Sequence, residues 1–180
     1  MPAVAGSSTD RLIVLAGYNG LGTAQDWARQ LAIHAPQLCA AVYSWRQARQ
    51  AADSIAAMPG RRVTLIGHSL GGGQAQRIVR RLPAGTIDRL ITVAPFAPRD
   101  LETALVRQKV GSWLNIVCAR RWHDPLLNLT ARIALGWRDQ GAIADASENY
   151  VSRHPHQDFY RMVSERCGAA ANAEPWLAGV

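Results

Sequence analysis

The sequence predicts an α/β protein: a three-layer α/β/α sandwich built on a mainly parallel sheet of about five to six strands. Apolar runs of strand length alternate along the chain with segments of helical periodicity, as in parallel sheets whose strands are joined through helices. A Gly-x-Ser-x-Gly motif at residues 67–71 lies between one such run and one such segment. No internal repeat divides the 180 residues, so a single domain is expected.

Length and composition suit one compact domain. This domain is expected to span residues 1–180, with its core at about 11–168 and a peripheral tail at 169–180. A hydrophobic content of 48% with 18% charged residues suits a compact globular chain. The first residues lack a signal-peptide pattern, and no stretch approaches the ~18 apolar residues that a membrane span needs. We therefore expect a cytoplasmic protein without a membrane span.

The charge bears on nucleic-acid and anionic partners, and the cysteines bear on buried thiols and metal sites. The net charge is +7, and Lys109 is the one lysine among 20 basic residues. No nucleic-acid-binding motif accompanies this charge, so we expect a scattered, solvated basic surface and no nucleic-acid partner, with an anionic partner as the alternative. Cys39 and Cys118 lie in apolar runs, which indicates buried thiols. No cluster has metal-ligand spacing, so no metal is expected.

The first predicted unit is a strand, a loop and a helix. Residues 12–16 (LIVLA) predict a strand buried on both faces. The loop GYNGLG follows, and a helix is expected to begin near Thr23, with Asp26 completing a capping box. Gly20 and Gly22 could also begin a dinucleotide-binding Gly-x-Gly-x-x-Gly motif. Gln25 stands at its third glycine, and no acidic residue ends the next strand, so no nucleotide cofactor is expected.

The Gly-x-Ser-x-Gly motif carries the chemical signal. Residues 63–66 predict a buried strand, and the apolar periodicity after residue 74 predicts a helix. A sharp turn between them would lift the hydroxyl of Ser69 clear of the sheet, and Gly67 and Gly71 leave room for so tight a turn. The backbone N–H of Leu70 begins the helix and is placed to stabilise an oxyanion. A serine that only caps the helix is the alternative.

The remaining elements follow the same alternation. Strands are expected at 40–43, 90–94 and 113–119, and helices at 45–58 and 100–110. Loop 95–98 should share the carboxyl edge of the sheet with Ser69. We expect a helix at 126–135, a loop at 136–149 that covers or walls the site, and a final helix beginning with the stripe of Phe159, Met162 and Val163. Tyr150 and Val151 give the one sign of a last strand.

The run LIGHSLGGGQA resembles the nucleophile elbow of the α/β-hydrolase superfamily, of the lipase, esterase and thioesterase kind. The resemblance implies a minimal α/β-hydrolase fold, because the family's two leading antiparallel strands have no counterpart here. It also implies that the loop AGYNG supplies a second oxyanion donor, the backbone N–H of Tyr18. Ala16 stands where the family often has histidine, a departure that leaves this backbone donor in place.

The resemblance also supplies candidates for the catalytic acid. The segment WHDPLL is similar to the family's acid-bearing loop, which implies that Asp124 is the triad carboxylate. A helix cap is its alternative role. Asp100, which follows the preceding strand, is the competing carboxylate, and Asp139 and Asp145 are weaker candidates.

Two histidines near residue 155 are the candidates for the general base. The segment HQDF resembles the His-x-x-Phe around the family's base, which favours His156. His154 is the second choice. The chain order Ser69, Asp124, His156 is the order of the α/β-hydrolase triad.

The implied function is that of a serine esterase. Ser69 would cleave a carboxylic ester or thioester through an acyl-enzyme, on a small-molecule or lipid ester and without a cofactor. An acyltransferase using the same intermediate and a catalytically silent binding module are the alternatives. The sequence specifies neither the acyl chain nor the oligomeric state.

Overall fold

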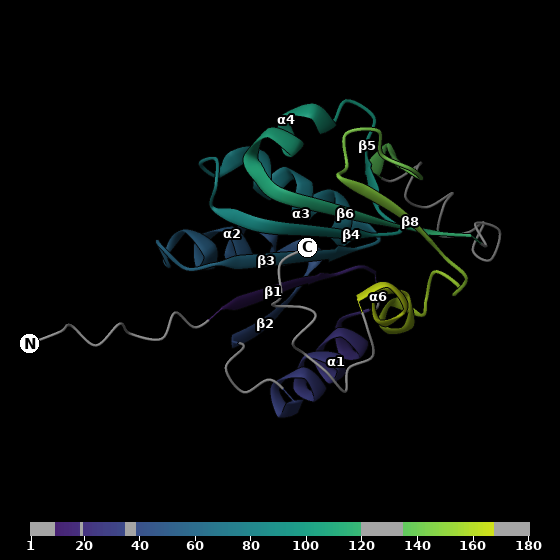
Figure 1. Ribbon diagram of the computed structural model, residues 1–180, viewed down its shortest axis with the longest axis horizontal. Coiled ribbons are helices and arrows are strands. Elements are labelled where there is room, and N and C mark those ends of the chain that lie inside the picture. Colours follow the sequence, from purple (N-terminus) through teal and green to yellow (C-terminus); the bar gives the residue numbers. More distant parts are fainter. Residues whose placement is uncertain (1–9, 19, 35–38, 120–134, 168–180) are drawn as a thin grey trace, which may run out of the picture.

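A computed structural model describes residues 10–18, 20–34, 39–119 and 135–167. Six strands form one sheet in the order β2-β1-β3-β4-β6-β8 (Figure 1). Every neighbouring pair in this sheet is parallel, which confirms the predicted strand number and direction. The strands are β1 (Arg11–Ala16), β2 (Cys39–Ser44), β3 (Val63–His68), β4 (Ile87–Val93), β6 (Val110–Cys118) and β8 (Glu148–Ser152).

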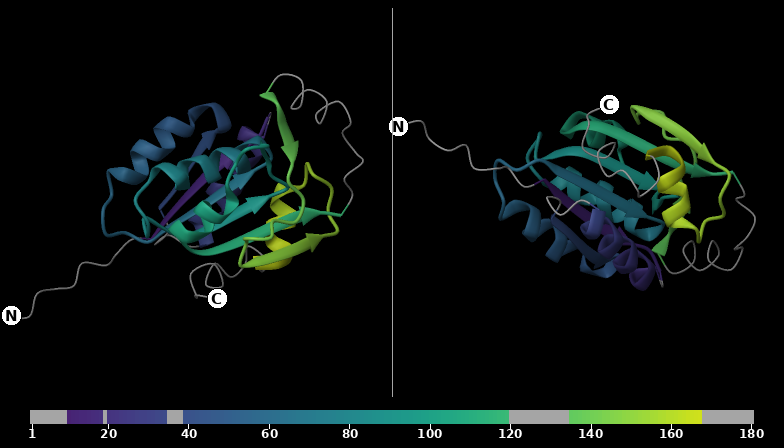
Figure 2. Two further views of the ribbon diagram at one scale, coloured as in Figure 1. Left: turned by 90° about the horizontal axis from the view of Figure 1, so that it is seen from above. Right: turned by 60° about the horizontal axis from the view of Figure 1, so that its bottom comes forward.

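Helices cover both faces of the sheet, so the three-layer sandwich is confirmed (Figures 1 and 2). Helices α1 (Leu21–His34) and α6 (Phe159–Cys167) lie side by side on one face. The other face carries the short helix η1 (Trp45–Gln47) together with α2 (Ala48–Ala56), α3 (Leu70–Arg81) and α4 (Thr103–Lys109). None of the helices in the described ranges is long and apolar enough to cross a bilayer.

The two cores explain why β1 is a continuous apolar run. Leu12 and Val14 pack in the core beneath α1 and α6, whereas Ile13 and Leu15 pack in the core beneath α2 and α3. All four side chains are at most 2% exposed. Because alternate residues of a strand point to opposite faces, only a run without polar positions satisfies both cores.

Several expectations differ from the structure. Helix α1 begins at Leu21, so Thr23 lies inside it and no acidic residue occupies its first turn, which removes the expected capping box. Cys39 is half-buried at an edge of the sheet, where its sulfur accepts a hydrogen bond from Arg11. The expected loops at 95–98 and 136–149 contain the short strands β5 (Phe96–Pro98) and β7 (Trp137–Asp139), which pair antiparallel.

The chain after β7 is fixed to the sheet by buried amides. The side chains of Gln76 and Gln140 donate hydrogen bonds to each other. Asn115, fully buried in β6, donates to the carbonyl of Gly141 and to Asn149 Oδ1, each at 2.8 Å. Thr92 Oγ1 donates to Asn115 Oδ1 at 2.9 Å. These bonds tie the β7–β8 connection to helix α3 and to strand β6, which Thr92 joins to β4.

The helix expected at 126–135 lies almost wholly outside the described residues, and so does the tail at 169–180. The last strand, β8, is longer than Tyr150 and Val151, the two residues that indicated it, and it forms one edge of the sheet.

Candidate active site

Ser69 occupies a tight turn between β3 and α3, as the motif predicts. Its backbone has φ +55° and ψ −123°, a region that residues other than glycine rarely adopt. The Ser69 N–H donates to the carbonyl of Val93 at 2.9 Å, and its carbonyl accepts from the N–H of Gly72 and of Phe96 at 2.9 and 3.0 Å. Hydrogen bonds to two neighbouring segments thus hold the strained conformation.

The glycines of the motif are required by close backbone approaches. A Cβ atom on Gly67 would lie 2.5 Å from the carbonyl oxygen of Gly71, and one on Gly71 would lie 2.1 Å from that of Leu15. Helix α3 therefore starts in direct contact with the ends of β3 and β1, and this contact fixes where Ser69 stands.

The loop after β1 lies against the serine. A Cβ on Gly17 would lie 2.6 Å from Ser69 Cβ and 3.3 Å from its Oγ. Ser69 is only 2% exposed, and its Oγ has no hydrogen-bond partner among the described residues. Tyr18 comes next in this loop with a 55% exposed side chain, and the buried Leu70 begins α3. Both predicted oxyanion donors therefore belong to residues that adjoin this contact.

His156 also lies at this edge of the sheet. Its imidazole centroid is 4.9 Å from that of His68, the residue before Ser69, and 5.8 Å from the ring of Phe96. His154 is fixed differently: its N–H donates to Ser152 Oγ, and its carbonyl accepts from the Cys118 thiol. The structure thus brings His156 to the segments that hold Ser69, and ties the backbone of His154 to the ends of β6 and β8.

The carboxylate candidates fall in different places. Asp124 lies outside the described residues. Asp139 accepts a hydrogen bond from the N–H of Gly141, and Asp145 accepts one from the hydroxyl of Thr103. Asp100 is exposed just beyond β5. Asp139 therefore fixes its own turn, and Asp145 ties its segment to the start of α4.

His68 is a site residue whose contacts the sequence did not reveal. It is 8% exposed, and its Nε2 lies 2.8 Å from the backbone oxygen of His156. Burial, followed by the charge of His156, lowers the pKa of His68 to about 3. No sequence motif marks this contact, because the partner of His68 lies 88 residues away.

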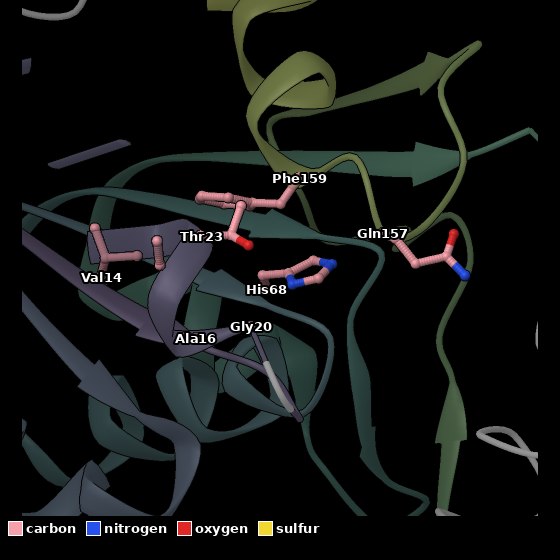
Figure 3. Close-up of a pocket in the computed structure, with 8 residues that line it drawn as sticks. Val14, Ala16, Gly20, Thr23, His68, Gln157 and Phe159 are labelled. Carbon is pink, nitrogen blue, oxygen red and sulfur yellow. The ribbon is translucent and has the colours of Figure 1, made fainter. Parts of the chain in front are cut away.

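A small cavity adjoins this histidine. It measures about 30 Å³ and is lined by His68, Thr23, Gly20 and Phe159 together with Val14, Ala16, Ala24 and Gln157. In Figure 3 the imidazole lies in the middle of this group, and the Gln157 amide extends away from it. Such a volume accommodates about one water molecule and no substrate.

An aromatic cluster borders the other side of the elbow. Leu70, Phe96 and Trp137 are buried together, and Trp45 packs against them. The guanidinium of Arg77 lies 5.9 Å from the centroid of the Trp137 ring. This cluster could not be predicted from the sequence, because Trp137 lies in a segment that was expected to be a loop. Among the described residues, no group of three His, Cys, Asp or Glu side chains is arranged to hold a metal ion.

Comparisons with known proteins bear on the family and the fold. A sequence model described as the alpha/beta hydrolase family matches residues 7–178. One similar solved structure is the esterase domain of a Rhodothermus marinus protein, which is 13% identical with a TM-score of 0.55. The alignment covers 97% of this chain and 86% of that one. No curated protein matches the sequence. At this identity the structural likeness concerns the fold.

Proposed function

Because the chain belongs to the alpha/beta hydrolase family, we propose that it is a serine hydrolase that cleaves a carboxylic ester or thioester through an acyl-enzyme on Ser69. The observation that carries the proposal is the strained turn at Ser69, with Gly17 packed against its side chain and His156 near the same turn. A backbone conformation of this cost is retained where it presents a side chain for chemistry.

Each residue has a defined role in the proposed reaction. Ser69 Oγ attacks the acyl carbonyl while His156 takes its proton, and His156 then protonates the leaving group. Asp124 orients the imidazole and stabilises its charged form. The N–H groups of Leu70 and Tyr18 stabilise the oxyanion, each contributing on the order of 100-fold in rate. Water, activated by His156, then releases the acyl group.

An apolar substrate group fits the residues next to the proposed nucleophile. Leu70, which follows Ser69, is apolar and packs with Phe96 and Trp137, which supports a small-molecule or lipid ester. Ser69 is 2% exposed, so a substrate has to shift the groups that cover it.

The test is hydrolysis of p-nitrophenyl esters from acetate to palmitate, together with labelling by a fluorophosphonate. We expect the wild type to turn over and to be labelled, and Ser69→Ala to lose both while keeping its circular dichroism spectrum. Undiminished turnover in Ser69→Ala would refute the nucleophile assignment. A folded wild type that is labelled yet releases no more than about one equivalent of p-nitrophenol would favour the acyltransferase, and one that is not labelled would favour the silent binding module.

The same assay tests the other two members of the triad. His156→Ala and Asp124→Asn should each lower kcat by on the order of 10⁴-fold, the size of the loss when a triad partner is removed. His154→Ala and Asp100→Asn are the matched controls and should stay within about tenfold of wild type. A larger loss in either control would transfer the role to that residue.

A further inference from the structure

We propose that His68 is a positioning residue, which holds the general base in place by donating a hydrogen bond from its imidazole to the backbone carbonyl of His156. The inference rests on the proposed function, in which His156 is the base. It concerns a residue that touches neither substrate nor the reacting atoms in that mechanism.

The acceptor determines which nitrogen of His68 carries the proton. A carbonyl oxygen only accepts, so Nε2, at 2.8 Å from the oxygen of His156, must be the N–H donor. Nδ1 is then the acceptor of the ring and faces Gly20 on the side of the small cavity. Since His68 is buried and its pKa is lowered, the neutral Nε2–H form persists throughout the pH range in which a histidine base works.

Packing holds the donor ring in one orientation. The His68 imidazole lies 4.9 Å from the ring of His156 and 5.3 Å from that of Phe159, the first residue of α6. Phe159 in turn packs edge-on against Trp27 of α1 at 5.4 Å. Figure 3 displays the ring of Phe159 beside the imidazole of His68. The turn of His156 is thus held at two points, at the carbonyl of His156 and at the ring of Phe159, which follows the turn.

The hydrogen bond affects the site because His68 directly precedes Ser69 in the chain. His68 ends β3 and is bonded directly to Ser69, whose own N–H is fixed to Val93. One strand end therefore locates both the nucleophile and the segment of the base, two groups that are 87 positions apart in the sequence. Proton transfer depends on their separation, and a displacement of about 1 Å can cost on the order of 100-fold in rate.

Two substitutions separate the hydrogen bond from the packing. His68→Phe keeps an aromatic ring and removes the donor. His68→Gln removes the ring and keeps an amide N–H at a similar distance from the backbone. We expect His68→Phe to lower kcat by about 10- to 100-fold with KM within about threefold of wild type, and to slow fluorophosphonate labelling in parallel. His68→Gln should stay within about fivefold of the wild-type kcat.

Either of two results would overturn the proposal. One is a wild-type kcat in His68→Phe. The other is a kcat in His68→Gln as low as in His68→Phe, with both proteins folded at the assay temperature, since the ring and not the donor would then be required.

A second measurement does not depend on activity. In Ser69→Ala with isotope-labelled histidine, nitrogen NMR should report His68 as the neutral Nε2–H form from about pH 5 to 8. Protonation on Nδ1, or titration within this range, would eliminate the hydrogen bond and the proposal with it. If the NMR form is as expected but the wild type neither turns over nor is labelled, the proposed function has failed and His68 holds a structural turn only.

Discussion

Gly17 lies where any larger residue would collide with Ser69, the proposed nucleophile. A Cβ at this position would be 2.6 Å from Ser69 Cβ, closer than such atoms approach. We predict that Gly17→Ala lowers kcat/KM by at least about tenfold, because either Ser69 or the loop that carries Tyr18 has to move. Ester hydrolysis measures this directly.

Gly22 provides the matched control. It lies in α1, and a Cβ there would meet nothing within 4 Å. Gly22→Ala should keep wild-type kcat/KM and raise the free energy of unfolding by up to about 1 kcal/mol, because alanine favours the helix. Equal activities of the two variants would show that the contact at Gly17 does not matter for turnover.

Single residues differ in how far the sequence reveals them. The position of Ser69 in a tight turn was predictable because its motif, strand and helix are contiguous, and so was its closeness to residues 95–98. The contact of His68 with His156 was not, because its acceptor is a backbone atom distant in the sequence. Backbone carbonyls have no residue type, so no motif marks such a contact.

At the scale of elements, an ion pair and a hydrogen-bonded carboxylate join β8 and the residue after it to α6, the elements that flank the turn of His156. Arg166 of α6 donates two hydrogen bonds to Glu148 of β8. Glu165 accepts from the hydroxyl of Ser152 and from Arg153. The bond from Arg166 is the main cause that lowers the pKa of Glu148, and the bond from Ser152 is the main cause for Glu165.

These lowered pKa values predict an acid-sensitive contact. Since each carboxylate has a lower pKa in the folded than in the unfolded protein, its stabilisation is complete above the ordinary value of 4.5 and is lost as the pH falls through the folded value. We predict that Arg166→Gln lowers the free energy of unfolding at pH 7 by no more than about 1 kcal/mol, because both side chains are partly exposed, and by less near pH 3.

Urea unfolding at the two pH values measures the effect. Arg161→Gln is the control on the same helix. The Arg161 side chain is 66% exposed and its Nη1 lies 3.8 Å from Asp158 Oδ2, so this ion pair is longer and more exposed than that of Arg166. It should change the stability less than Arg166→Gln does at pH 7. A loss in Arg166→Gln that is equal at both pH values would contradict the assignment of the acid-sensitive contact.

Elements were predictable in proportion to their burial. Strands β1, β3, β4 and β6 have neighbours on both sides and helices on both faces, so their runs are apolar. Strand β8 lies at an edge, where Val151 is 60% exposed, and its polar residues serve hydrogen bonds. Strand β7 pairs with β5, about 40 residues earlier, and a three-residue strand has no periodicity to detect.

For the molecule as a whole, the sheet predicts a gradient of local stability. Strands β3 and β4 are central, whereas β2 and β8 each have one neighbour. Amide hydrogen exchange should be slowest in β3 and β4 and faster in β2 and β8, because an edge strand opens by breaking one ladder. Exchange in β8 as slow as in β3 would mean that the sheet opens only as a unit.

In the proposed mechanism, the backbone conformation of Ser69 favours catalysis at the expense of stability. A non-glycine residue at φ +55° costs about 1–3 kcal/mol, out of the 5–15 kcal/mol that typically separates a folded domain from its unfolded chain. Ala94, at φ +42° beside it, adds a similar cost. Selection for thermal resistance alone would therefore drive position 69 toward glycine and remove the hydroxyl. Variants of this protein that are selected for thermal stability should therefore also be screened for turnover, because the most stable ones are expected to lack activity.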